Sequence, residues 1–157
     1  MSNTETMTKT SFADYVATQD ARNTIQLNVR KYTLMLCDAL LLDYVERSIK
    51  HHKLSIAAGN EVGNYHQNAI DELKNGNYDS IDYKFYIEEG RKYHKIVMDT
   101  GNQLSVHAFV DKKTGEVYKP ASFKAPAKIV RYNLLSIESR EKCFERADWA
   151  GGYLYIR

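Results

Sequence analysis

Apolar residues recur every three or four positions between Asp20 and Leu54, which is the spacing of a helix face. Two stripes follow this period, and a helix that is apolar on more than one side is normally covered by other elements. The stripes are Ile25, Val29, Tyr32, Leu36 and Leu40, and Leu27, Leu34, Leu41, Val45 and Ile49. A long central helix is predicted over residues 20–54, although residues 24–30 also alternate like a strand.

Two shorter helices are predicted on either side of this stretch. Ser11 is placed to cap a helix over residues 11–19, where Phe12, Tyr15 and Val16 share one face. Residues 64–75 also have helical periodicity, and Gly76 follows them in a position that commonly ends a helix. The polar residues 1–10 are predicted to form a flexible tail.

The hydrophobic period changes to strict alternation after residue 81, which indicates strands. Four strands are predicted, over residues 83–87, 93–98, 104–110 and 116–119. Short turns that contain Gly101 and Gly115 separate the later strands, and such turns join antiparallel neighbours. Residues 81–119 are therefore predicted to form an antiparallel meander.

The C-terminal segment combines a loop with one more helix. Pro120 and Pro126 bracket residues 121–135, which are predicted to be loop with a short ordered piece. Ser136 is a candidate N-cap for a helix that ends near Ala147, and residues 153–156 are a candidate terminal strand.

The predicted fold class is α+β, with one domain over residues 11–157. Its helical N-terminal half (residues 11–76) packs on a small antiparallel meander of about three to five strands (residues 81–119). Loop and a C-terminal helix follow over residues 120–157. The length of the chain, 157 residues, fits one hydrophobic core.

Charge is distributed unevenly, although the whole chain carries only +2. Residues 60–90 hold seven acids and two bases, whereas residues 112–132 hold six bases and one acid. A concentrated basic segment of this kind can neutralise the phosphates of a nucleic acid. Aromatic residues lie between these cations, and flat rings can stack on unpaired bases.

The predicted nucleic-acid contacts therefore combine cations with aromatic rings, and DNA or RNA is the expected partner. These candidates are Lys112, Lys113, Lys119, Phe123, Lys124, Lys128, Arg131 and Tyr132. Lys112 and Lys113 are expected at an exposed hairpin tip. The alternative is a solvated or partner-facing surface that balances the acidic segment.

No motif predicts catalysis, a metal or a cofactor. Asp99-Thr100-Gly101 matches the catalytic loop of aspartic proteases, but a turn between two strands explains it. His94 and His107 are expected on one face of the sheet, where a metal site would need a third ligand. No phosphate-binding loop is found, and Cys37 and Cys143 are expected to be reduced thiols.

The predicted compartment is the cytoplasm, or the host cytoplasm if the protein is viral. The N-terminal residues lack the basic and apolar regions of a signal peptide. The densest apolar run, residues 34–45, is interrupted by Asp38 and Asp43, so no membrane association is expected. The long apolar helix leaves room for a homodimer interface.

The second half of the chain resembles a group of uncharacterised small proteins of tailed, often marine, bacteriophages. Four segments carry the resemblance: YKFYIEEGRKY (83–93), SVHAFVDKKTGEVYKPAS (105–122), KAPAK (124–128) and ADWAGGY (147–153). It covers about residues 83–157. The group commonly has an aromatic residue larger than Phe at the position of Phe123. The resemblance implies a phage-encoded accessory protein, but no activity and no catalytic residue.

Two functions therefore remain open. One is a phage accessory protein that binds nucleic acid through the basic segment. The other is a protein–protein interaction factor, either an inhibitor of a host enzyme or a virion or assembly component, because opposed charges and many tyrosines are common at interfaces.

Overall fold

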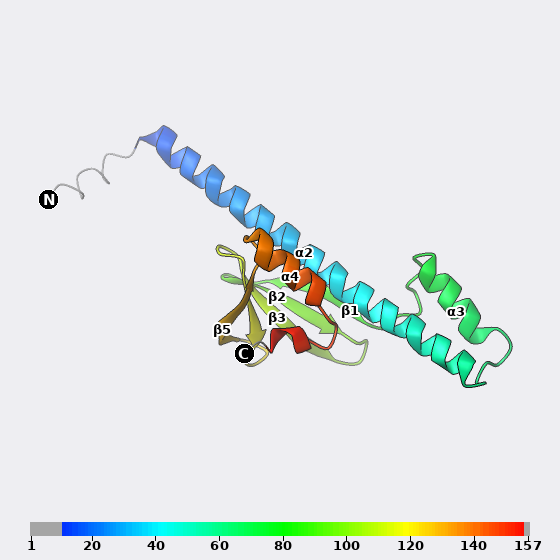
Figure 1. Cartoon of the computed structure of the whole chain (residues 1–157). Coiled ribbons are helices and arrows are strands. Elements are labelled where there is room, and N and C mark those ends of the chain that lie inside the picture. The colour runs from blue at the N-terminus through cyan, green and yellow to red at the C-terminus, as the bar shows by residue number, and fades with distance from the viewer. Residues whose placement is uncertain (1–10, 156–157) are drawn as a thin grey trace.

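The computed structural model of the chain describes residues 11–155 and has an α+β fold, as predicted (Figure 1). Its helices are α2 (Phe12–Ala57), α3 (Tyr65–Lys74), α4 (Ile137–Arg146) and the 3-10 helix η1 (Gly152–Leu154). Its strands are β1 (Lys84–Glu89), β2 (Tyr93–Asp99), β3 (Leu104–Asp111), β4 (Glu116–Pro120) and β5 (Pro126–Asn133). The expected flexible tail, residues 1–10, lies outside the described residues.

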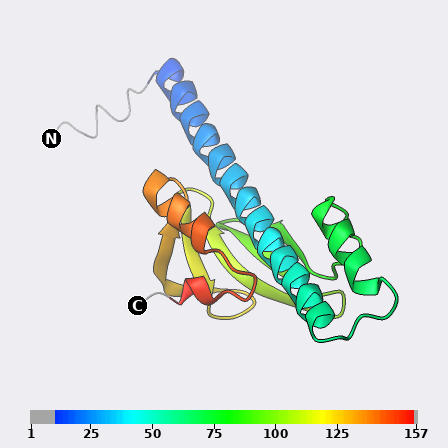
Figure 2. The same cartoon turned by 45° about the vertical axis from the view of Figure 1, so that its right-hand side comes forward.

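One continuous helix of 46 residues, α2, replaces the two helices predicted for residues 11–19 and 20–54. Ser11 is its N-cap, because the Ser11 hydroxyl accepts a hydrogen bond from the backbone N–H of Asp14 at 3.0 Å. No Gly or Pro interrupts the segment, so nothing stops the helix near Asp20. The strand alternative for residues 24–30 is wrong. The N-terminal part of α2 projects beyond the sheet (Figures 1 and 2).

The five strands form one antiparallel sheet in which each strand pairs with its neighbours in sequence. Residues that lie directly opposite each other in such a sheet point to the same face. Ile87, Ile96 and Ala108 form one such row, and Ile96 and Ala108 are fully buried. This row faces the helices, and we call that side of the sheet the helix face.

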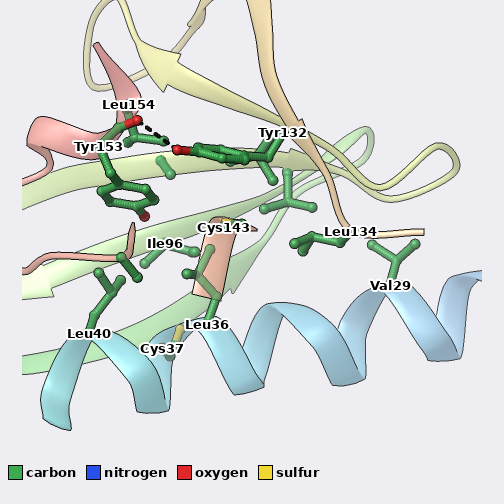
Figure 3. Packing of buried hydrophobic residues seen from close by; sticks show 14 residues of the cluster. Val29, Leu36, Cys37, Leu40, Ile96, Tyr132, Leu134, Cys143, Tyr153 and Leu154 are labelled. Carbon is green, nitrogen blue, oxygen red and sulfur yellow. Dashed lines mark hydrogen bonds between the residues drawn. The ribbon is translucent and has the colours of Figure 1, made fainter. Parts of the chain in front are cut away.

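The hydrophobic core lies between the helix face and α2, and α4 and η1 close it at the side (Figure 3). Leu36 and Leu40 of α2 are fully buried there with Ile96, Cys143 and Leu154. Burying each such side chain contributes about 1.5–3 kcal/mol to folding. The core therefore depends on residues from both ends of the chain.

Two predictions for the C-terminal region are wrong. Residues 126–133 form strand β5 at the edge of the sheet, where Pro126 is tolerated as the first residue. Residues 152–154 form a 3-10 helix instead of a terminal strand, and Ile156 lies outside the described residues. The helix capped by Ser136 is confirmed, because the Ser136 hydroxyl accepts from the N–H of Ser139.

Helices α2 and α4 cover the same face of the sheet (Figures 1 and 2). The opposite face, which we call the far face, is therefore left to side chains of the strands and their loops. Within residues 11–155, every helix is too short or too polar to cross a membrane.

Candidate nucleic-acid interface

One row of side chains crosses all five strands on the far face. Glu88 lies opposite Lys95, Lys95 opposite Phe109, Phe109 opposite Tyr118, and Tyr118 opposite Val130. Glu88, Lys95 and Phe109 are each next in sequence to a residue of the buried row Ile87, Ile96 and Ala108. Because successive residues of a strand point to opposite faces, the row that contains Glu88 points away from the helices. The alternation places a basic and an aromatic residue side by side at the centre of the sheet.

Aromatic rings gather around this row. The ring of Tyr93 lies 5.7 Å from that of Phe109 and 6.2 Å from that of Tyr118. Phe123, in the loop between β4 and β5, covers the same region, because Lys95 Nζ lies 4.4 Å from the Phe123 ring and 5.8 Å from the Phe109 ring. The Phe109 ring is buried, whereas Phe123 is 46% exposed. Phe123 therefore presents a ring face to solvent above a cation.

Cations surround these rings. A shallow cavity of about 230 Å³ on the far face is lined by Tyr93 and Phe109 together with four cations and one acid. The charged residues are Arg91, Lys92, Lys95, Lys124 and Glu88. Lys95 Nζ lies 3.8 Å from Glu88 Oε1, and Lys92 Nζ lies 5.3 Å from the centre of the Tyr93 ring. Charge and flat apolar surface therefore occur together here.

The structure separates the predicted basic segment into different surfaces. Phe123 and Lys124 lie at the far face, and the side chain of Lys128 is exposed on β5. Lys113 is exposed beside the N-terminal half of α2. These residues are close in sequence but do not form one patch.

Lys112 is not an exposed hairpin-tip cation, so that prediction is wrong. Its side chain is 16% exposed and donates to Glu89 Oε2 at 2.7 Å and to the Gly90 carbonyl at 3.1 Å. The hydrogen bond and the charge of Lys112 lower the pKa of Glu89. The partner lies 23 residues earlier in the chain, which no local pattern reveals.

Three further candidates are also engaged by other parts of the protein. The prediction that Tyr132 stacks on bases is wrong, because Tyr132 is buried and donates to the Tyr153 carbonyl at 3.1 Å (Figure 3). Lys119 Nζ lies 4.2 Å from the ring of Tyr155. Arg131 is half-buried in the edge strand. None of these three lines the far-face cavity.

Sequence reasoning missed Arg91, Lys92, Tyr93 and Lys95, which are half of the residues that line the far-face cavity. The signal was present, because Tyr93 and Lys95 occupy alternate positions of one strand and therefore share a face.

The two histidines lie on the helix face, as expected, and both are buried. His107 Nε2 lies 2.8 Å from the hydroxyl of Tyr153, and burial lowers the pKa of His107 to about 4. Asp99 is the last residue of β2, and its Oδ1 accepts from the backbone N–H of Gly101 in the following turn at 2.8 Å. In the described part of the chain, no three His, Cys, Asp or Glu side chains are grouped to hold a metal.

Neither the curated proteins nor the solved structures contain a match to this chain. One family model matches residues 12–156, which is nearly the whole chain. The protein therefore belongs to the family described as "Family of unknown function (DUF7717)".

Proposed function

We propose that this protein binds single-stranded nucleic acid on the far face of its sheet. The observation that carries the proposal is the exposure of the Phe123 ring on a basic surface. The residue is 46% exposed, and Lys95 Nζ lies 4.4 Å from the centre of its ring. The contact with Lys95 gives this exposed ring a fixed position beside the cations of the far face.

Each group on this face has a role in the proposed complex. Phe123 stacks on a base, and the exposed cations Arg91, Lys92 and Lys124 neutralise neighbouring phosphates. Lys95 holds the Phe123 ring in place. Paired bases are already stacked within a duplex, so a ring on a shallow surface reaches only unpaired bases. A preference for single strands over duplex follows.

The experiment is a fluorescence-anisotropy titration with labelled single-stranded DNA, duplex DNA and RNA at two salt concentrations. Phe123→Ala should weaken single-strand binding by about 1–3 kcal/mol, which is roughly 5- to 150-fold in Kd. Phe12→Ala is the matched control, because Phe12 is also an exposed phenylalanine but lies at the start of α2. It should leave binding unchanged.

Three outcomes would reject this function. The first is the absence of binding to any nucleic acid at low salt. The second is equal loss in Phe123→Ala and Phe12→Ala. The third is equally tight binding to polyglutamate, which supplies negative charge but no bases and would indicate an acidic protein partner.

The phage resemblance fits this proposal, since it implies an accessory protein that works in the host cytoplasm. A protein-interaction role is the second candidate, whether as a host-enzyme inhibitor, a virion or assembly component, or a homodimer. The projecting part of α2 favours it, because Phe12, Tyr15 and Leu27 are 80%, 57% and 67% exposed. A monomeric sedimentation profile, together with no partner recovered from bacterial lysate, would count against this role.

A further inference from the structure

A second basic surface lies between the N-terminal half of α2 and the turns at one end of the sheet. Two adjoining cavities of about 490 and 430 Å³ form it, and both are lined by Asn23 and Gln26 of α2. We call their combined lining the α2 groove. Its charged residues are Arg22, Arg30, Lys112, Lys113 and Glu89. Arg30 and Lys112 both pair with Glu89, whereas Arg22 and Lys113 are exposed.

The groove side of α2 carries several hydrogen-bond donors, with the apolar side chains of Ile25 and Leu27 beside them. Gln19, Asn23, Gln26 and Arg30 recur every three or four residues and therefore share one face of the helix. The residues that α2 buries against the sheet begin at Val29, beside Arg30, and continue through Leu36 and Leu40. Over the groove itself, the amide and guanidinium groups suit an anionic ligand.

His94 of β2 adds an independent observation at the base of this groove. Its side chain is 2% exposed, and within residues 11–155 its Nδ1 has no hydrogen-bond partner. An unsatisfied buried polar atom is costly, so a ligand that pairs with it is favoured. Burial lowers the pKa of His94, so the imidazole is neutral near pH 7. The Nδ1 of a neutral imidazole donates or accepts according to the tautomer, so it can pair with a polar group of a ligand.

The groove and the far face meet at the same end of the sheet. Lys112 joins the two turns there, because its backbone N–H donates to the Lys92 carbonyl at 3.0 Å and its Nζ donates to the Gly90 carbonyl at 3.1 Å. Gly90 and Lys92 also line the far-face cavity. A chain that leaves the far face over this turn therefore enters the α2 groove, and Arg91 lies on its path.

We infer that the α2 groove binds the phosphates of the same single strand, beyond the part that the far face holds. This inference rests on the proposed function and extends it to a longer ligand that bends around the turn between β1 and β2. Arg22 and Lys113 are the residues best suited to a test, because both side chains are exposed and lie on opposite walls of the groove.

The test compares oligothymidylates of about 4 and about 16 nucleotides, which span the range of site sizes of small single-strand-binding domains. The groove variant is Arg22→Ala with Lys113→Ala. The control is Lys53→Ala with Lys74→Ala, which removes two equally exposed cations at the α3 end of the molecule. Binding is measured by anisotropy over a range of salt concentrations.

The groove variant should weaken binding of the long oligonucleotide roughly tenfold near 0.1 M salt and leave the short one unchanged. The slope of log K against log salt should fall by about 1.4, because each lost phosphate contact on a single strand removes about 0.7. The control should change neither. Phe123→Ala should weaken binding of both lengths, because the far face is needed for each.

The failures of the two proposals are distinguishable. If wild-type protein binds both lengths but the groove variant behaves like the control, the inference about the α2 groove is wrong and the far-face function stands. If the groove variant weakens both lengths equally, the two surfaces do not divide the strand as inferred. If wild-type protein binds neither length, the proposed function fails, and the groove inference fails with it.

Discussion

His107 provides a pH dependence of stability that can be worked out from its surroundings. Its imidazole is 7% exposed, lies against the ring of Phe85, and has Nε2 2.8 Å from the Tyr153 hydroxyl. Burial disfavours the charged imidazolium and lowers the pKa of His107 to about 4, and Asp148 opposes this effect. The folded protein therefore requires His107 to be neutral.

The sign of the effect follows from the two pKa values. An unfolded chain takes up the His107 proton near its ordinary pKa of about 6.5, well before the folded chain does. The contribution of His107 to stability is therefore complete above pH 6.5 and is lost as the pH falls toward 4. The full difference corresponds to about 3.4 kcal/mol, of which about 2 kcal/mol is lost between pH 7.5 and pH 5.

The assay is urea denaturation of wild-type protein and His107→Gln at pH 7.5 and pH 5. The free energy of unfolding of the variant should fall by about 2 kcal/mol less than that of wild type over this range. Contributions from other groups, including His94 and His52, are present in both proteins and cancel in the comparison. Tyr153→Phe keeps the buried imidazole and should retain the wild-type pH dependence. An equal pH dependence in wild type and His107→Gln would refute the reasoning.

Three further predictions concern the packing of the fold. Gly115→Ala should destabilise the protein by about 1–3 kcal/mol more than Gly101→Ala in urea denaturation. Both glycines have positive φ, but only at Gly115 would an added Cβ meet Leu135, at 3.0 Å, so equal losses would contradict this prediction. Asp43→Ala should cost about 1–3 kcal/mol in the same assay, since Asp43 Oδ2 accepts from the backbone N–H of Trp149 at 3.0 Å. Arg47→Ala, which removes only the exposed ion pair with Asp43, should cost less than about 1 kcal/mol; the reverse order would count against the Trp149 contact. Cys37 and Cys143 should not react with a disulfide reagent at pH 8 in the native protein, because both are buried and burial raises the pKa of each thiol to about 12. Both should react in guanidinium chloride, and rapid reaction of the native protein would contradict their burial.

The α+β class and most strands could be predicted from the sequence, because hydrophobic periods report directly on helix and strand faces. The single α2 could not be separated from two helices, since Ser11 is a clear cap but no residue marks whether the helix continues past Gln19. Strand β5 was missed because Pro120 and Pro126 suggest a loop. At a sheet edge, however, Pro126 occupies a position that needs no ladder N–H.

The candidate site was harder to predict than the fold. Phe123 and Lys124 could be named from local composition, and both lie at the far face. Lys112 was misjudged because its ion pair with Glu89 arises from strand pairing. Lys95 was missed because its role depends on its contact with the Phe123 ring. Phe123 is 28 positions later in the sequence, and the loop between β4 and β5 brings it next to Lys95. Contacts of this kind are set by register, which a count of charges along the chain does not contain.

The order of elements along the chain has a consequence for synthesis. Each strand pairs with the next one to emerge from the ribosome, so the sheet can assemble stepwise with little loop closure. Leu36 and Leu40 of α2 emerge first, yet Cys143 and Leu154, which complete the core around them, are made last. A chain stopped near residue 135 would have a paired sheet and an uncovered helix stripe. Such a truncated product should be a better target for chaperones and proteases than a chain that includes α4 and η1.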